Sequence, residues 1–121
     1  MGMTRVEITL FSRERDRQRT LEAMVDTGSV FTWIPEAIAA DLGLVPLESW
    51  RFRTIDGRII ERSVCDAPVE IQKRRGIVRT VFAKPGDACV LGVTALEILG
   101  LTVDPTTGRL REEDATLAFA A

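Results

Sequence analysis

Asp26 is the residue to which a catalytic role is most readily assigned. It is the first residue of the sequence Asp26-Thr27-Gly28-Ser29. The apolar residues Ala23–Val25 directly before it predict a strand that delivers the carboxylate into a tight turn of small, hydrogen-bonding residues. Two carboxylates held about 3 Å apart cannot both ionise, so such a pair shares one proton. The ionised member can take a proton from water while the protonated member donates one to a carbonyl oxygen. An ordinary strand-end turn is the alternative interpretation.

The residue types that the chain lacks narrow the possible chemistry. It contains no histidine, which excludes Ser-His and Cys-His catalysis and every zinc site that needs imidazole. It contains no tyrosine, so no phenolic acid or nucleophile is available. Cys65 and Cys89 are too few and too widely spaced for a disulfide scaffold or a Cys-x-x-Cys metal site. We therefore expect no metal and no cofactor, and two free thiols, with a single disulfide as the alternative.

The elements that must position Asp26 are mainly strands, because apolar and polar residues alternate along much of the chain. Hairpin turns are predicted at Asp56-Gly57, at Arg74-Arg75-Gly76 and at residues 105–108. The first of these favours a type I′ turn, which needs positive φ at both central residues. The predicted strands are Arg5–Leu10, Leu21–Val25, Trp50–Thr54, Arg58–Val64, Val69–Ile71, Ile77–Phe82, Leu101–Asp104 and Arg109–Arg111.

Two short helices complete the predicted fold. The first begins at Pro35, which suits a first helical position, and ends at Gly43, which can adopt the left-handed conformation. The second runs from about Thr94 to Leu99, with Thr94 and Glu97 at the spacing of a capping box. Many short strands and two short helices predict a single all-β, barrel-like domain over the whole chain.

A second motif, Val90-Leu91-Gly92, leads into the second predicted helix. Together with the Asp26 motif it resembles the retropepsin-like aspartic proteases, in which an apolar-apolar-Asp-Thr-Gly-Ser/Ala loop is crossed by a later apolar-apolar-Gly strand and a helix. Leu91 and Gly92 would make this crossing. The stretch Phe31–Pro35 also looks like the family's continuation of the loop, and the Asp56-Gly57 hairpin falls where the family places its flap. The resemblance covers nearly the whole chain, ending at Leu99.

The resemblance implies a role for each residue of the first motif. Asp26 would be the catalytic carboxylate, and the Gly28 N–H would face it. Ser29 would hydrogen-bond the outer carboxylate oxygen, and Thr27 would bond the loop of a partner copy.

The same resemblance implies a flap that covers an extended peptide and donates backbone hydrogen bonds to it. The residues of this expected flap tip are Ile55, Asp56, Gly57 and Arg58. A plain surface hairpin is the alternative, with Asp56 acting only as a turn-former. Trp33 and Trp50 are expected in the core rather than in substrate subsites.

A chain of 121 residues with one Asp-Thr-Gly supplies only one carboxylate of the pair. Asp56 and Asp104 are explained as turn residues, and Asp41 and Asp66 have no supporting context. The resemblance therefore implies a homodimer with its active site on the twofold axis. The tail from about residue 112 would lie at the dimer interface or fray.

The net charge and hydropathy of the chain indicate which binding partners and which cellular location to expect. The net charge of −2 gives no electrostatic reason to expect nucleic acid or an anionic membrane as a partner. The arginines from Arg13 to Arg19 are interrupted by Glu14 and Asp16, which favours a solvated hairpin tip over a phosphate-binding patch. The most apolar stretch, Cys89–Val103, is too short for a membrane span. We expect a cytoplasmic protein.

The expected function is that of an endopeptidase that cleaves extended peptides in a groove with apolar subsites. One alternative is a retropepsin-fold dimer that binds a peptide or protein partner without cleaving it, and another is a structural β-barrel dimerisation module. The intact Asp-Thr-Gly-Ser favours the enzyme, because a binding module has no need of that carboxylate in that turn.

Overall fold

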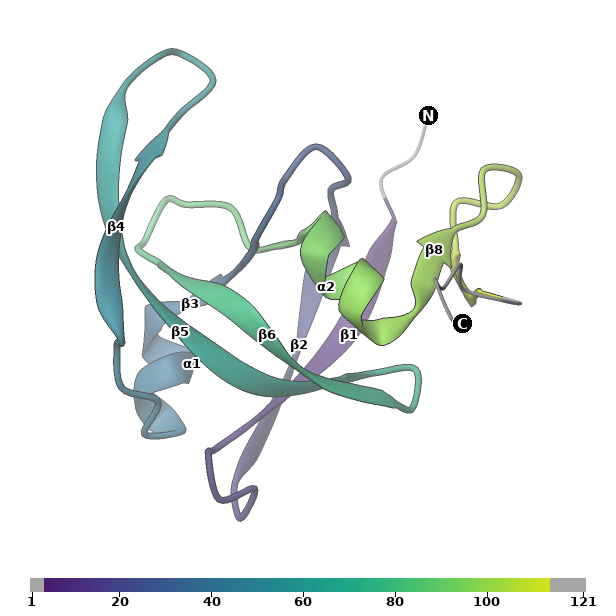
Figure 1. Cartoon of the computed structure of the whole chain (residues 1–121), viewed down its shortest axis with the longest axis horizontal. Helices are drawn as coiled ribbons and strands as arrows, with labels where there is room; N and C mark the ends of the chain where they lie inside the picture. Colours follow the sequence, from purple (N-terminus) through teal and green to yellow (C-terminus); the bar gives the residue numbers. More distant parts are fainter. Residues whose placement is uncertain (1–3, 114–121) are drawn as a thin grey trace, which may run out of the picture.

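The computed structural model describes residues 4–113, which form a mostly β fold with two short helices (Figure 1). Seven strands form one sheet in the order β1-β2-β7-β3-β6-β5-β4. Because β1 also pairs with β5, the sheet curls into a ring rather than a clear barrel. The elements are β1 (Arg5–Phe11), β2 (Gln18–Val25), β3 (Thr32–Pro35), α1 (Glu36–Asp41), β4 (Glu48–Arg53), β5 (Ile59–Ile71), β6 (Arg74–Ala83), β7 (Val90–Leu91), α2 (Val93–Leu99), β8 (Leu101–Val103) and β9 (Leu110–Glu112).

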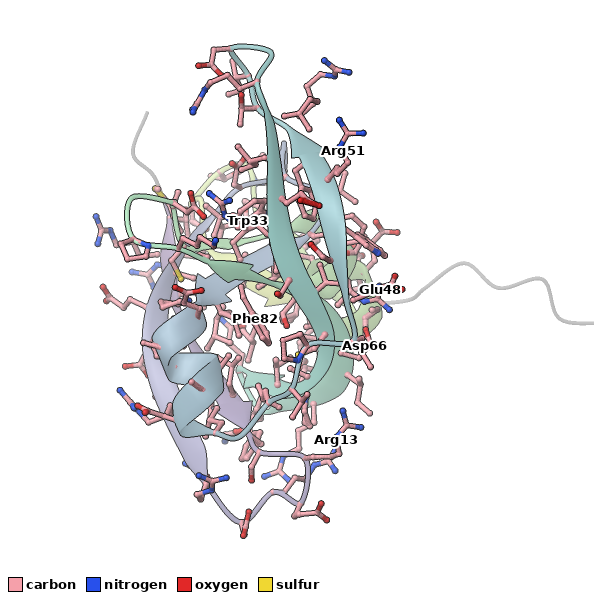
Figure 2. The ribbon with its side chains drawn as sticks, turned by 90° about the vertical axis from the view of Figure 1, so that its left-hand side faces the viewer. Arg13, Trp33, Glu48, Arg51, Asp66 and Phe82 are labelled. Carbon is pink, nitrogen blue, oxygen red and sulfur yellow. The ribbon has the colours of Figure 1, made fainter. Side chains whose placement is uncertain are left out.

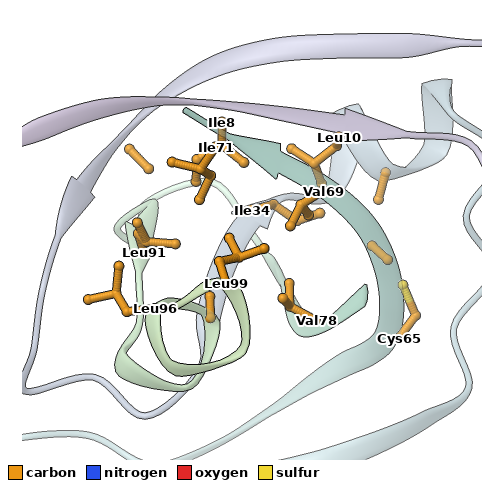
Figure 3. Packing of buried hydrophobic residues seen from close by; sticks show 14 of the residues in the cluster. Ile8, Leu10, Ile34, Cys65, Val69, Ile71, Val78, Leu91, Leu96 and Leu99 are labelled. Carbon is orange, nitrogen blue, oxygen red and sulfur yellow. The ribbon is translucent and has the colours of Figure 1, made fainter. Parts of the chain in front are cut away.

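The core lies inside this ring and is built from aliphatic side chains (Figure 3). Ile8 and Leu10 of β1 are buried at alternate positions, as their period of two predicts. Helix α2 adds Leu96 and Leu99 to the same cluster. Each such side chain stabilises the fold by about 1.5–3 kcal/mol when it is fully removed from water. The buried cluster fixes the strands whose ends carry the candidate site.

Strand β5 is longer than the sequence predicts. The two short strands expected at 58–64 and 69–71 are one strand of 13 residues. Residues 64–69 are nearly all buried, so the alternation that marks a half-exposed strand disappears there. Pro68 lies within the strand opposite Ile77. The long strand pairs with β4 at one end, and with β6 and β1 at the other.

The turn between β5 and β6 was predicted two residues too late. It is formed by Gln72 and Lys73, with φ of 50° and 69°, and β6 already begins at Arg74. Gly76 lies inside β6 opposite Val69, where α2 packs closely against it. A Cβ atom at this position would be 3.0 Å from Leu99 Cδ2. The glycine therefore makes room for a helix and does not form the turn.

The Asp56-Gly57 turn is in the predicted place but has another geometry. Only Gly57 has positive φ, at 87°, so the turn is not type I′. The Gly57 N–H donates to the Thr54 carbonyl at 2.9 Å, and the Thr54 N–H donates to the Arg58 carbonyl at 2.8 Å. Ile55 and Asp56 are thus the central residues, and Gly57 takes the left-handed position that follows such a turn in three-residue hairpin loops.

Both helices occur where they were predicted, with different starts. Helix α1 spans Glu36–Asp41, because Pro35 still belongs to β3, and Gly43 ends it with a φ of 67°. Helix α2 begins one residue early, at Val93, with Gly92 as its N-cap and no side-chain cap. The predicted capping box of Thr94 and Glu97 is therefore wrong.

The remaining sequence predictions have mixed outcomes. Cys65 and Cys89 are free thiols, as expected. The arginine-rich segment forms the turn between β1 and β2 and the start of β2. Two of its arginines bind Asp41 of α1: Arg17 donates to the backbone carbonyl, and Arg19 of β2 pairs with the carboxylate. No helix within residues 4–113 has the length and apolar character needed to cross a bilayer. The tail beyond residue 113 lies outside the described residues.

Candidate active site

Asp26 follows β2, whose last two residues pair in parallel with β7. Met24 lies opposite Val90, and Val25 lies opposite Leu91. The pairing continues one residue further, because the Asp26 N–H donates to the Leu91 carbonyl oxygen at 3.0 Å. The backbone of the carboxylate-bearing residue is thereby fixed against the strand that the sequence predicted to cross it.

The predicted crossing at Gly92 brings two backbone segments into contact. A Cβ atom there would lie 2.5 Å from the Phe31 carbonyl carbon and 2.9 Å from the Ser29 carbonyl oxygen, and would overlap the Phe31 oxygen. The torsion angles of Gly92, φ −90° and ψ 169°, are accessible to any residue. Glycine is therefore needed here for the close approach and not for its conformational freedom. The Gly92 N–H donates to the buried Thr32 Oγ1 at 3.0 Å.

The first turn of α2 donates its free backbone N–H groups to the Asp26 loop. The Val93 N–H donates to the Ser29 carbonyl at 2.8 Å, and the Thr94 N–H donates to the Val30 carbonyl at 3.1 Å. The Thr94 hydroxyl donates to the same Val30 oxygen at 2.6 Å. The loop carbonyls thus replace the side-chain cap that a helix start requires, which explains why Thr94 forms no capping box.

The carboxylate of Asp26 is held within its own loop. Its Oδ1 accepts from the Gly28 N–H at 2.9 Å, in the position that the resemblance implied. The expected bond from Ser29 to the carboxylate is absent, because the Ser29 hydroxyl donates to the Phe31 carbonyl at 2.8 Å and so stabilises the loop backbone. Asp26, Thr27 and Gly28 are all exposed, so this part of the loop faces outward.

A hairpin projects beyond the rest of the sheet (Figures 1 and 2), and residues near its tip line a pocket together with Asp26. This projecting hairpin comprises residues 48–64. The pocket has a volume of about 310 Å³. The pocket is lined by Asp26, Trp33, Thr54, Ile55, Ile60, Asp87, Ala88 and Val90. Three segments that are distant in sequence, residues 26–33, 54–60 and 87–90, therefore meet around the carboxylate.

Of the four residues predicted at the flap tip, only one lines this pocket. Ile55 lines it and is otherwise fully exposed. Asp56, Gly57 and Arg58 are exposed and do not line it. Arg58 Nε donates to Asp56 Oδ2 at 2.9 Å, and the Arg58 N–H donates to Thr54 Oγ1 at 3.1 Å. These three residues therefore shape the turn that carries Ile55.

The two tryptophans are not core residues, contrary to expectation. Trp33 is half-buried, lines the pocket, and meets Phe52 of β4 edge-on at 5.1 Å between ring centroids. Trp50 is half-buried on the projecting hairpin, where Phe31 packs against it at 5.5 Å and the Arg79 guanidinium lies 4.8 Å from its ring centre. Their size suggested burial, but both pack where the hairpin meets the rest of the domain: Trp33 against Phe52 of the hairpin, and Trp50 of the hairpin against Phe31 and Arg79.

A family model described as gag-polyprotein putative aspartyl protease matches residues 16–98, which is more than half of the chain. The chain belongs to this family. The match includes Asp26, the projecting hairpin and Gly92. No curated protein matches the sequence.

The sequence did not predict one of the residues that line the pocket of this aspartyl protease domain. Asp87 lies in the loop between β6 and β7 and lines the pocket together with Asp26. Its carboxylate accepts two hydrogen bonds from Arg62 of β5, at 2.6 and 3.0 Å. These bonds lower the pKa of the Asp87 carboxyl below its ordinary value, so it stays ionised. The sequence around Asp87 resembles a turn, and nothing in it points to Arg62.

The domain has a second bidentate pair, between residues that lie opposite each other on β5 and β6. Arg79 of β6 donates to both carboxylate oxygens of Asp66, at 2.6 and 3.2 Å. This hydrogen bonding lowers the pKa of the Asp66 carboxyl. Of the two carboxylates that line the pocket, Asp87 alone has such a cationic partner among residues 4–113. Within residues 4–113, no group of three or more acidic or sulfur-bearing side chains is arranged to hold a metal ion.

Proposed function

We propose that this domain is an aspartic endopeptidase that acts as a homodimer, with one Asp26 carboxylate from each copy. One observation carries the proposal: an exposed carboxylate, oriented by the Gly28 N–H, lines a pocket beneath a projecting hairpin. A carboxylate that served only to close a turn would have no need of a pocket. The domain's family membership supports the same chemistry.

The reaction follows from two carboxylates that share one proton. The ionised Asp26 takes a proton from water as the water oxygen attacks the scissile carbonyl carbon. The protonated Asp26 of the other copy donates its proton to the carbonyl oxygen, which gives a neutral tetrahedral diol. The first carboxyl then protonates the amide nitrogen while the second takes a proton from a diol hydroxyl, and the C–N bond breaks. The pair regains its single shared proton.

The pocket indicates the kind of substrate. Its wall is largely apolar, with Trp33, Ile60 and Val90 as its larger members. A cavity of about 310 Å³ lies at the lower end of the usual range for ligand sites. We infer that it receives one large apolar side chain of an extended peptide, and that Ile55 at the tip of the projecting hairpin, acting as a flap, covers it.

Exposure around Asp26 supports the dimer. Val30, which follows the Asp-Thr-Gly-Ser run, leaves 53% of its surface exposed although it is apolar. The neighbouring Thr27 is also exposed. A twofold contact through this loop would cover both residues and place the second carboxylate beside the first.

The test is hydrolysis of a diverse peptide library between about pH 4 and pH 7 by the native chain, by Asp26→Asn and by Asp41→Asn. The last is a matched control, because Asp41 forms an exposed ion pair away from the pocket. We expect cleavage by the native chain and the control, and none by Asp26→Asn. If the native chain binds peptides as a stable dimer but cleaves none, the domain is a peptide-binding module instead.

A further inference from the structure

The projecting hairpin has few attachments to the rest of the domain. Pairing between β5 and β6 begins only at Val64, opposite Val81. Nearer the tip, β4 and β5 pair with each other and with no other described strand. On the β4 side, the aromatic contacts of Trp50 and Phe52 hold the hairpin to β3 and the residue before it. The β5 side needs an attachment of its own.

Arg62 provides this attachment. It lies on the same face of β5 as the pocket residue Ile60, two positions away, and only 14% of its side chain is exposed. Its Nε donates to Asp87 Oδ2 at 2.6 Å and its Nη2 donates to Asp87 Oδ1 at 3.0 Å. A bidentate pair of this kind fixes the relative orientation of both side chains.

Asp87 connects Arg62 to the loop that forms part of the pocket wall. Its Oδ2 also accepts from the Lys84 N–H at 2.9 Å, and its own N–H donates to the Lys84 carbonyl at 2.9 Å, so the carboxylate closes the turn of loop 84–89. Asp87 and Ala88 line the Asp26 pocket. Asp87 also lines a second cavity of about 240 Å³, together with Cys89 and residues of α1.

We propose that Arg62 and Asp87 are a positioning pair, which holds the projecting hairpin against loop 84–89 and so sets the width of the Asp26 pocket. Each side chain of the pair is mostly buried, so loss of one partner leaves the other charge poorly hydrated. The hairpin and the loop would then move apart to rehydrate it. The consequence for cleavage rests on the proposed function, whereas the consequence for the hairpin does not.

The test is hydrogen exchange of the full chain, followed by mass spectrometry, for the native protein, Arg62→Gln, Asp87→Asn and the double variant. The asparagine amide oxygen in the second of these variants would still accept from the Lys84 N–H. We expect the amides of residues 54–60 and 84–90 to exchange roughly tenfold faster in each single variant, since a charge-assisted hydrogen bond is lost. The double variant should exchange no faster than the more affected single variant.

Arg75→Gln is the matched control, because Arg75 of β6 pairs with Glu70 near the other end of β5, away from the pocket. It should leave the exchange of both segments unchanged. Unaltered exchange in Arg62→Gln, or strictly additive effects in the double variant, would overturn the proposal.

Peptide cleavage separates this proposal from the proposed function. If the native chain cleaves, the single variants should raise KM for large apolar substrates several-fold more than they lower kcat. If the native chain cleaves peptides but exchange is unaltered in the single variants, the proposed endopeptidase function stands and the proposed positioning role of Arg62 and Asp87 is wrong. If the native chain cleaves no peptide, the proposed endopeptidase function is wrong. Hydrogen exchange of the hairpin amides still tests the positioning role of Arg62 and Asp87.

Discussion

At the scale of single residues, Gly92 is the described glycine at which an added Cβ would meet the closest backbone atoms. Its Cβ would meet backbone atoms of Phe31 and Ser29, which cannot move without displacing the Asp26 loop. We expect Gly92→Ala to lower the free energy of unfolding by about 3 kcal/mol or more, since overpacking against a fixed backbone exceeds the usual range. Urea denaturation followed by tryptophan fluorescence measures this change.

Gly86 is the matched control for this prediction. It has a φ of 96°, and an added Cβ would meet no atom within 4 Å. Gly86→Ala should therefore cost only the strain of a left-handed conformation, about 1 kcal/mol. Equal losses in the two variants would show that close approach at Gly92 is not the main constraint.

The carboxylate of Asp87 predicts a dependence of stability on pH. Its pKa is lowered in the folded state, so its ion pair with Arg62 contributes fully above the ordinary value of 3.8 and is lost as the pH falls through the lower folded pKa. Lys84 and Glu36 are the other charges near the pair. We expect Asp87→Asn to be less stable than the native chain by about 1–3 kcal/mol at pH 7. The difference should shrink below about pH 4, as urea titrations at several pH values would show.

Residue identities predicted part of the site and could not predict the rest. The placement of Asp26, the Gly28 bond and the crossing at Gly92 depend on short motifs, so they were available from the sequence. The resemblance implied the Asp26 carboxylate as the acceptor for the Ser29 hydroxyl, and only the folded loop shows that the acceptor is the Phe31 carbonyl. The pairing of Arg62 with Asp87 joins residues 25 positions apart and leaves no local pattern.

At the scale of secondary structure, the packing of α2 on β6 depends on Gly76. A Cβ there would lie 3.0 Å from Leu99 Cδ2 and 3.1 Å from Ile98 Cγ2, both ends of flexible side chains. We expect Gly76→Ala to cost about 1–2 kcal/mol, less than Gly92→Ala, because these side chains can shift. Hydrogen exchange should locate the loss in α2, while β1 and β2 stay protected. A faster exchange confined to the turn at residues 72–73 would contradict this assignment.

Gly76 also shows why the presence of a strand or helix was predicted more reliably than the residues at which it begins and ends. A glycine beside two arginines has the composition of a turn, and the long-range contact with α2 leaves no mark near it in the sequence. The same holds at Thr94, whose capping-box spacing with Glu97 was overridden by the carbonyl of Val30. Alternation and glycine positions predicted most strands, but contacts between distant segments decided the turns and caps.

At the scale of the whole molecule, the proposed homodimer makes activity depend on protein concentration. If each site needs two copies of Asp26, the rate at low concentration should rise with the square of the chain concentration and become linear once dimers dominate. Peptide hydrolysis over a dilution series, with sedimentation of the same samples, measures both quantities. A rate that stays linear while sedimentation shows only monomers would exclude the shared site.

Thr27 tests where that dimer forms. Its side chain is exposed in the single chain, so Thr27→Ala should leave the free energy of unfolding of the monomer unchanged within about 0.5 kcal/mol. If Thr27 bonds the loop of a partner copy, the same variant should weaken the dimer roughly tenfold, the effect of losing one well-placed hydrogen bond per copy. Its activity should then fall at low concentration and recover at high concentration, where mass action restores the dimer. Thr27→Ser keeps the hydroxyl and should behave like the native chain. A loss of activity that no concentration restores would place Thr27 in the chemistry of the site instead of in its assembly.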